Sequence, residues 1–262
     1  MESSVIFPFL LALAAGGATV IGAALTFFIR KNDFKILALG MSFSAGVMIY
    51  LSFSDIMPLA KEYIAPNGSK GGLLLAYSMF FLGAGIAAVI DYFVPEHLES
   101  ENLECPKCPK QSFNKTKRAA ILSAIALAAH NFPEGLSVFV TTLEDATVGI
   151  AIAFAILLHN IPEGISVALP IYNSTGSKKK AFWIATFSGM TEPLGALAAY
   201  FIFAPLLTPA VIGSALALTA GMMVFISLDE LLPMAKEYGE EHYGIFGAFA
   251  GMAFIALSSL IF

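Results

Sequence analysis

Eight apolar stretches, each long enough to cross a bilayer as a helix, constrain the fold of this chain more than any other feature. They cover about residues 5–29, 36–60, 71–94, 119–143, 147–171, 181–204, 210–234 and 243–262. A helix needs about 20 apolar residues to span the hydrocarbon core of a membrane. Only 13% of the residues are charged, against roughly a quarter in soluble domains. The sequence therefore predicts an all-α integral membrane protein, with residues 1–262 forming one polytopic domain.

The basic residues fall on one side of these predicted spans. If the N-terminus lies outside, the inner loops hold 12 of the 14 lysines and arginines, and only Lys61 and Lys70 fall outside. Positive residues favour the cytoplasmic side, and eight spans return the C-terminus to the side of the N-terminus. We therefore expect both termini outside, and we expect the loop at residues 95–118, between the third and fourth spans, to be cytoplasmic.

Internal repeats relate the predicted spans in pairs. Residues 45–63 align without gaps on residues 220–238 with nine of nineteen positions identical, and a weaker match sets Thr19 against Glu192. Each match joins an odd-numbered span to an even-numbered one, so the matched helices run in opposite directions. The sequence therefore predicts inverted repeats, with helices 1–3 related to 6–8 and helix 4 to 5. Transporters built this way hold their substrate near the midplane, where the repeats meet.

A further repeat places the same polar residues in two consecutive spans. The sequence His-Asn-Phe-Pro-Glu-Gly at 130–135 recurs as His-Asn-Ile-Pro-Glu-Gly at 159–164. Histidine and glutamate four residues apart share one helix face, one turn apart. An ionisable side chain in mid-membrane costs several kcal/mol unless it is partnered, which favours a functional site. The predicted metal ligands are His130, Asn131, Glu134, His159, Asn160, Glu163 and Glu192.

Imidazole and carboxylate ligands together select a class of ion. They suit Zn²⁺, Fe²⁺, Mn²⁺, Co²⁺ and Cd²⁺, whereas Cu(I) prefers sulfur, and Mg²⁺ and Ca²⁺ prefer oxygen alone. The pattern predicts a transporter for divalent metal ions, with Zn²⁺ the leading candidate. We expect no catalytic residue and no cofactor beyond the transported metal. The expected partners are metal ions and membrane lipid, and no basic stripe indicates a nucleic acid.

The doubled motif, in consecutive helices of an eight-span chain, resembles the ZIP (Zrt-, Irt-like) family of metal transporters. The short loops and the two His-Asn pairs are most similar to its bacterial ZupT-like branch. The resemblance implies movement of one helix bundle against another, broad divalent selectivity and a binuclear site. One metal position would use His130, Glu134, His159 and Glu163. The other would use Asn131, Asn160 and Glu192, with Glu134 and Glu163 bridging the two.

Other polar residues are secondary candidates. Asp55 lies near the outer end of one predicted helix, and Asp229 and Glu230 lie near the inner end of its repeat partner, so they are candidates for an entrance and an exit. Solvated helix ends explain them equally well. In the cytoplasmic loop, His97, Cys105 and Cys108 are candidates for metal capture, with an ordinary solvated loop as the alternative. The small-residue run at 83–85 is compatible with a homodimer.

Two other functions compete with metal transport. A proton-coupled transporter of a non-metal solute also uses histidine and glutamate chains. An intramembrane metalloenzyme would need His-Glu-x-x-His or Glu-x-x-His spacing, and neither motif is present. Transport that depends on the metal would distinguish a metal transporter from a solute transporter and from a metalloenzyme.

Overall fold

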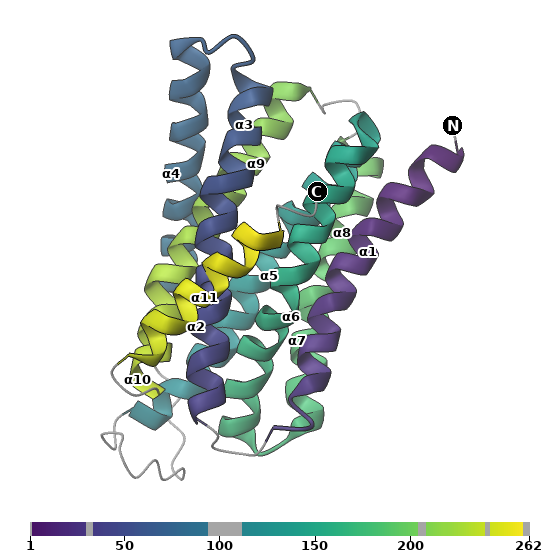
Figure 1. The fold of residues 1–262 in the computed structure, drawn as a ribbon. Coiled ribbons are helices and arrows are strands. Elements are labelled where there is room, and N and C mark those ends of the chain that lie inside the picture. Colours follow the sequence, from purple (N-terminus) through teal and green to yellow (C-terminus); the bar gives the residue numbers. More distant parts are fainter. Residues whose placement is uncertain (1, 30–33, 94–111, 204–207, 239–241, 259–262) are drawn as a thin grey trace.

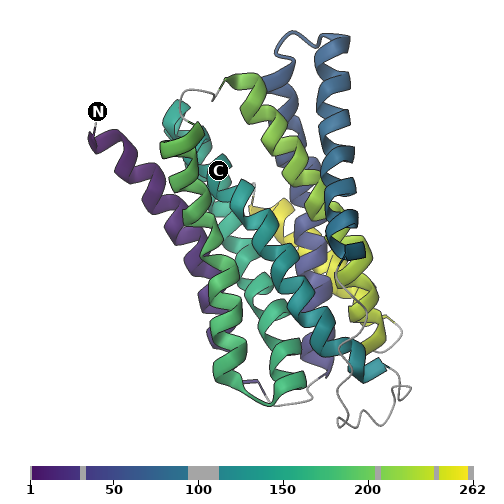
Figure 2. The same cartoon turned by 180° about the vertical axis from the view of Figure 1, so that it is seen from behind.

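The structure, a computed structural model, describes residues 2–29, 34–93, 112–203, 208–238 and 242–258. Over these residues it consists of helices and their connections, arranged side by side as long rods (Figures 1 and 2). The helices are α1 Glu2–Leu25, α2 Phe34–Leu51, α3 Met57–Ile64, α4 Lys70–Phe93, α5 Ser112–Glu144, α6 Ala146–Thr175, α7 Lys178–Gly189, α8 Thr191–Ala198, α9 Pro209–Ile226, α10 Leu232–Tyr238 and α11 Tyr243–Ser258. The predicted all-α fold is confirmed.

Three short π-helical turns connect or extend these helices. The turn η1 (Ser52–Ile56) joins α2 to α3, η4 (Ser227–Leu231) joins α9 to α10, and η2 (Ala199–Phe203) extends α8. With these joins, and with α7 followed directly by α8 across Met190, the described helices form eight rods, one for each predicted span. The fourth rod begins earlier than expected, since α5 starts at Ser112 rather than at residue 119.

Five segments among the described residues are long and apolar enough to cross a membrane. They are Val5–Leu25, Ala38–Ile64, Lys70–Tyr92, Ala146–Thr175 and Pro209–Lys236. The helix α11 is as apolar but shorter. Large apolar side chains such as Phe81, Phe249 and Leu257 are exposed on the outside of the rods, as they are in proteins that face lipid rather than water. The protein is therefore an all-α membrane protein.

The two turns η1 and η4 have the same local cause. Proline has no backbone N–H, so Pro58 and Pro233 each leave a carbonyl of the preceding helical turn without its usual partner. The chain responds with a wider turn, in which Met57 N–H bonds to the carbonyl of Ser52 and Leu232 N–H bonds to that of Ser227. The repeat that aligns residues 45–63 on 220–238 also pairs the two turns, because it sets Ser52 against Ser227.

The rods pack as two groups. A first bundle consists of α1, α5, α6, α7 and α8, in which α1 packs on α6 and α5 packs on α8 and α6. A second bundle consists of α2, α3, α4, α9, α10 and α11, in which α2 packs on α11 and α4 packs on α9. The bundles meet along α2 with α6 and along α5 with α9. Figures 1 and 2 show them diverging toward the end of the molecule that carries both the N-terminus and the α3–α4 connection.

Helix α6, which carries one copy of the repeated motif, has clear start and stop signals. The Asp145 side chain accepts hydrogen bonds from the backbone N–H groups of Thr147 and Val148, which caps the first turn. Gly176 ends the helix in the left-handed conformation, with φ of 68°. The helix runs through Pro162 and Pro170 without interruption, so the motif sits in one continuous segment.

Candidate metal centre

A cluster of polar side chains lies inside the first bundle, where an apolar core would be expected. The members that the structure describes come from α5, α6 and α8, and all are fully or almost fully buried. They are Asn131, Glu134, His159, Asn160, Glu163 and Glu192. Burying three carboxylates in one apolar bundle is unfavourable unless cations or hydrogen bonds compensate their charge.

His159 lies between two of these carboxylates. Its Nε2 atom is 3.5 Å from Glu134 Oε2 on the neighbouring helix and 4.0 Å from Glu163 Oε2 one turn along its own helix. Two ligands of a tetrahedral Zn²⁺ ion, each about 2.0–2.1 Å from the metal, lie roughly 3.4 Å apart. The separation of His159 from Glu134 is therefore close to that of two ligands of one zinc ion, and its separation from Glu163 is longer by about half an ångström.

The two motif asparagines make matching pairs of hydrogen bonds. Asn131 Nδ2 donates to Glu163 Oε1 at 2.9 Å and to the carbonyl of Ser188 at 3.4 Å. Asn160 Nδ2 donates to Glu192 Oε1 and, at 2.9 Å, to the carbonyl of Ala15. Each amide thus links a buried carboxylate to a backbone carbonyl of another helix, which fixes where the carboxylate lies.

Glu192 is held in place by a break in the sixth rod. Helix α7 ends at Gly189 and α8 begins at Thr191, so Glu192 stands in the first turn of α8, where the helix dipole favours a negative charge. Pro193 has no N–H to continue the helix, which accounts for the break. Helix α5 approaches this turn so closely that a Cβ at Gly135 would strike the carbonyl oxygen of Glu192. The motif glycine therefore allows Glu192 to reach the cluster.

Several polar atoms in the cluster have no hydrogen-bond partner among the described residues. They are His159 Nδ1, Asn131 Oδ1, Asn160 Oδ1 and Glu192 Oε2. Native proteins rarely leave buried polar atoms unsatisfied, and those that do occur often mark a site for an ion or water. Nitrogen and oxygen lone pairs of this kind are suitable ligands for a divalent transition metal.

The described side chains do not by themselves close a metal cage. Within the part of the chain that the structure describes, no three His, Cys, Asp or Glu side chains converge tightly enough to enclose an ion. That criterion leaves out the asparagine oxygens, and the side chain of His130 lies outside the described residues, although its backbone belongs to α5. The predicted loop residues His97, Cys105 and Cys108 also lie outside the described residues.

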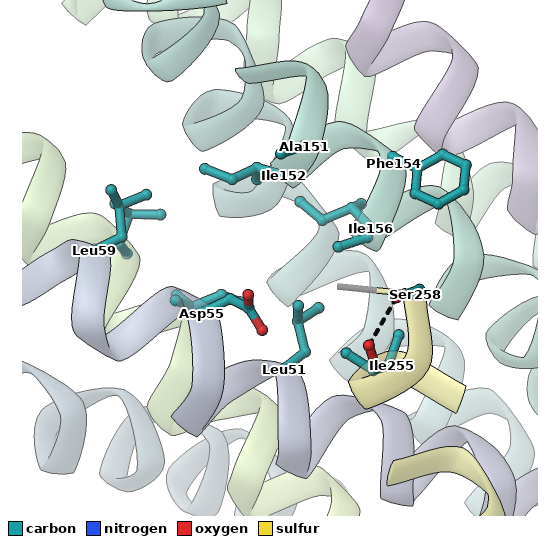
Figure 3. A pocket seen from close by; sticks show the side chains of 12 residues that line it. Leu51, Asp55, Leu59, Ala151, Ile152, Phe154, Ile156, Ile255 and Ser258 are labelled. Carbon is teal, nitrogen blue, oxygen red and sulfur yellow. Dashed lines mark hydrogen bonds between the residues drawn. The ribbon is translucent and has the colours of Figure 1, made fainter. Parts of the chain in front are cut away.

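The predicted entrance residue Asp55 lines a cavity of about 240 Å³ between the two bundles. Figure 3 shows it on η1, across the cavity from Ile152 and Ile156 of α6. Asp55 is exposed and accepts a hydrogen bond from Ser54, and it is the one charged residue among the described residues that line the cavity. Ile156 stands three residues before His159, so the cavity ends about one helical turn from the buried cluster.

The remaining secondary candidates have mixed outcomes. Asp229 is exposed and Glu230 is half-buried, and both belong to η4, the counterpart of η1. Gly83, the first residue of the small-residue run, packs inside the chain, since a Cβ there would strike the carbonyl of Leu218 on α9. Gly85 faces open space. The run at 83–85 is thus partly used within the subunit, and a homodimer stays a prediction.

The motif reasoning missed the backbone partners of the asparagines. The carbonyls of Ala15 on α1 and Ser188 on α7 accept the amide hydrogen bonds, yet nothing in their residue types indicates this role. The sequence repeat could have indicated that these two carbonyls occupy equivalent places. The alignment that sets Thr19 against Glu192, continued without a gap, also sets Ala15 against Ser188.

Comparison with known proteins gives a consistent result. Residues 95–259 match the family model described as ZIP Zinc transporter. The chain is 45% identical to the zinc transporter ZupT of Nitratidesulfovibrio vulgaris, over 100% of this chain and 99% of that protein. It is 45% identical to the zinc transporter ZupT of Clostridium perfringens, over 99% and 97% of the two chains. It is 43% identical to the Streptococcus mutans protein of that name, over the full length of both.

Proposed function

Because this chain belongs to the ZIP family of zinc transporters, we propose that it carries divalent transition-metal ions through the cell membrane into the cytoplasm, with Zn²⁺ as its main substrate. The observation that carries the proposal is the buried cluster inside an apolar bundle in which His159 Nε2 lies 3.5 Å from Glu134 and 4.0 Å from Glu163. Fe²⁺, Mn²⁺, Co²⁺ and Cd²⁺ share the ligand preferences of Zn²⁺ closely enough to be further substrates.

The proposed site holds two metal ions side by side. The ligands of the first position are His130, Glu134, His159 and Glu163, and those of the second are Asn131, Asn160 and Glu192, with Glu134 and Glu163 shared. The unsatisfied oxygens of Asn131, Asn160 and Glu192 support the second position. Two divalent cations offset the three negative charges that the bundle buries, and carboxylate bridges are common between closely spaced metal ions.

We propose further that the two halves of the chain are inverted repeats, with both termini outside. The matching turns η1 and η4 support this, since each precedes a proline at the same place in the repeat. The matching hydrogen bonds of Asn131 to Ser188 and of Asn160 to Ala15 support it independently. Inverted symmetry would give inward-facing and outward-facing forms of similar energy, through movement of the first bundle against the second.

The metal ion enters, in this proposal, through the cavity beside Asp55. A carboxylate at the mouth of an apolar cavity raises the local concentration of cations and so speeds their capture. The path from there to the buried cluster follows α6 past Ile156. Asp229 and Glu230, at the corresponding place in the other repeat, are the proposed exit residues on the cytoplasmic side.

Membership of a transporter family argues against the two competing functions. A proton-coupled solute transporter would move its solute without added metal. An intramembrane metalloenzyme would hold its metal permanently and turn over a substrate. Neither requires that a divalent ion itself cross the membrane, so the movement of the ion separates them from metal transport.

The test is metal entry into liposomes that contain the purified protein and a metal-sensitive dye. Zn²⁺, Fe²⁺, Mn²⁺, Cd²⁺ and Mg²⁺ are added separately to wild type and to Glu134→Ala, His159→Ala and Glu163→Ala. Entry of the transition metals without Mg²⁺, lost in all three variants, is the expected result. A folded wild-type protein that admits no ion would overturn the proposed function.

A further inference from the structure

The hydroxyl of Thr19 on α1 has no hydrogen-bond partner within the described part of the chain, although it is completely buried. Buried hydroxyls elsewhere in the described helices mostly donate to the carbonyl three or four residues earlier on their own helix. This holds for Ser42, Ser52, Ser137, Thr141, Thr142, Ser166, Thr219 and Ser227. At Thr19 the carbonyl four residues earlier belongs to Ala15, and it already accepts the Asn160 amide. Thr186 Oγ1 on α7 also has no partner among the described residues, but Thr186 as a whole is only partly buried, whereas Thr19 is completely buried.

Thr19 packs against two backbone segments that border the metal cluster. A Cβ at Gly164, the residue after Glu163, would strike the carbonyl of Thr19. A Cβ at Gly189 would lie 2.5 Å from Thr19 Cβ and 2.9 Å from its Cγ2. Gly189 follows Ser188, whose carbonyl accepts the amide of Asn131. Thr19 thus lies between two segments of the site: its backbone contacts the segment that carries Glu163, and its side chain contacts the segment that anchors Asn131.

The position of Thr19 is equivalent to that of Glu192 in the other half of the chain. The gap-free alignment that sets Ala15 against Ser188, the two carbonyls that hold the asparagines, also sets Thr19 against Glu192. Glu192 accepts a hydrogen bond from Asn160. At the equivalent place Asn131 donates to Glu163 instead, because threonine presents a short neutral side chain where its counterpart presents a carboxylate.

Resting on the proposed function, we infer that Thr19 Oγ1 is a further oxygen ligand of the transported cation, on the α1 side of the site. The buried charge then stays at three carboxylates rather than four, which favours release of the ion over its retention. A neutral hard oxygen contributes most to ions that prefer six oxygen-rich ligands, such as Mn²⁺. Zn²⁺ is satisfied by four ligands and depends on it less. Thr19 is therefore a residue that determines which metals the site accepts.

The experiment compares Mn²⁺ and Zn²⁺ in four proteins: wild type, Thr19→Val, Thr19→Ser and Thr219→Val. Valine keeps the shape of threonine and removes the hydroxyl, whereas serine keeps the hydroxyl. Thr219 is a buried threonine of the second bundle that bonds to its own helix, and it serves as the matched control. Uptake into liposomes and equilibrium binding by calorimetry are both measured.

We expect Thr19→Val to weaken Mn²⁺ binding and uptake about 10-fold and to change Zn²⁺ less than about 3-fold, in line with the loss of one neutral ligand. Thr19→Ser and Thr219→Val should match wild type for both ions. An unchanged ratio of Mn²⁺ to Zn²⁺ in Thr19→Val would overturn the inference. If that variant does not fold, Thr19→Ala against Thr19→Ser gives the same comparison. Wild-type protein that binds or transports neither ion would instead overturn the proposed function.

Discussion

The two bundles bury different kinds of side chain, although each contains segments that repeat one another in sequence. Within the described residues the first bundle buries three carboxylates, an imidazole and the amides of Asn131 and Asn160. The buried polar side chains described in the second bundle are hydroxyls, and those of Ser52, Thr219 and Ser227, for example, bond to carbonyls of their own helices. The first bundle carries buried negative charge that the amide hydrogen bonds of Asn131 and Asn160 compensate only in part. The second has the interior of an ordinary membrane helix bundle.

The difference indicates separate roles for the bundles. Hydroxyls that bond to their own helix need nothing from outside, so the second bundle is complete without an ion. The buried carboxylates of the first bundle gain stability when a divalent ion binds. We therefore propose that the first bundle is the part of the protein that responds to the substrate, and that it moves against the second.

The largest expected effect is on zinc uptake, and it distinguishes the buried carboxylates of the first bundle from the buried hydroxyls of the second. Replacing Glu163 by alanine removes a carboxylate that lies near His159 and holds Asn131. We expect zinc uptake to fall about 100-fold or more, because even partners one shell further from a metal contribute roughly 10–100-fold. Ser52→Ala in the second bundle is the control and should retain wild-type uptake. Equal losses in liposome assays of the two variants would break the comparison.

Close packing inside the first bundle gives the next effect. In Gly135→Ala the new Cβ meets the carbonyl of Glu192, so α8 must move away from α5. We expect a loss of about 1–3 kcal/mol in stability and a reduced uptake of zinc. Thermal unfolding in detergent measures the first quantity and liposome uptake the second. The control Gly85→Ala adds its Cβ into open space on α4, and a Gly135→Ala protein as stable as this control would contradict the packing account.

The two asparagines test whether the halves of the first bundle are equivalent. Asn131→Ala and Asn160→Ala each remove one amide that links a carboxylate to a carbonyl of a neighbouring helix. We expect both variants to weaken zinc binding by a similar factor, of about 10-fold. Calorimetric titration of the purified proteins measures the factor. A large effect in one variant and none in the other would show that the matching hydrogen bonds are not equivalent in function.

The smallest expected effect lies between the bundles, at Asp55. The residue is exposed at the cavity, so its charge attracts cations without holding them tightly. Asp55→Asn should raise the KM for zinc about 3-fold at low salt while the maximal rate stays unchanged, and the difference should shrink at high salt. Initial uptake rates at two ionic strengths measure this. An effect of Asp55→Asn on the maximal rate alone would contradict its role in capture.

Much of the fold was accessible from the sequence because long apolar segments allow few structures in a membrane. Each of the eight predicted spans coincides with a rod. The sequence repeat also pairs Pro58 with Pro233, the two prolines that follow the turns η1 and η4. The early start of α5 at Ser112 was not predicted, because a helix can continue past the apolar stretch into polar residues. Pro133 and Pro162 both lie within continuous helices, α5 and α6.

The candidate site was predicted in its residues but not in its contacts. The spacing of His159 and Glu163 places them on one helix face, and the structure keeps them there. The partners of Asn131 and Asn160 depend on how α1 and α7 pack against the motif helices, which no local pattern determines. The role of Thr19 could not be predicted from the sequence either, because a threonine in an apolar helix usually bonds to its own helix. Only the structure shows that its hydroxyl has no partner among the described residues.

The central claim is that a divalent ion binds the histidine and carboxylate cluster of the first bundle. X-ray absorption at the zinc edge, measured on purified protein loaded with Zn²⁺, tests it most directly. We predict a first shell of nitrogen and oxygen about 2.0–2.1 Å from the metal, including imidazole, with fewer ligands in Glu163→Ala. A shell dominated by sulfur at about 2.3 Å would assign the bound zinc to Cys105 and Cys108 and would contradict the claim.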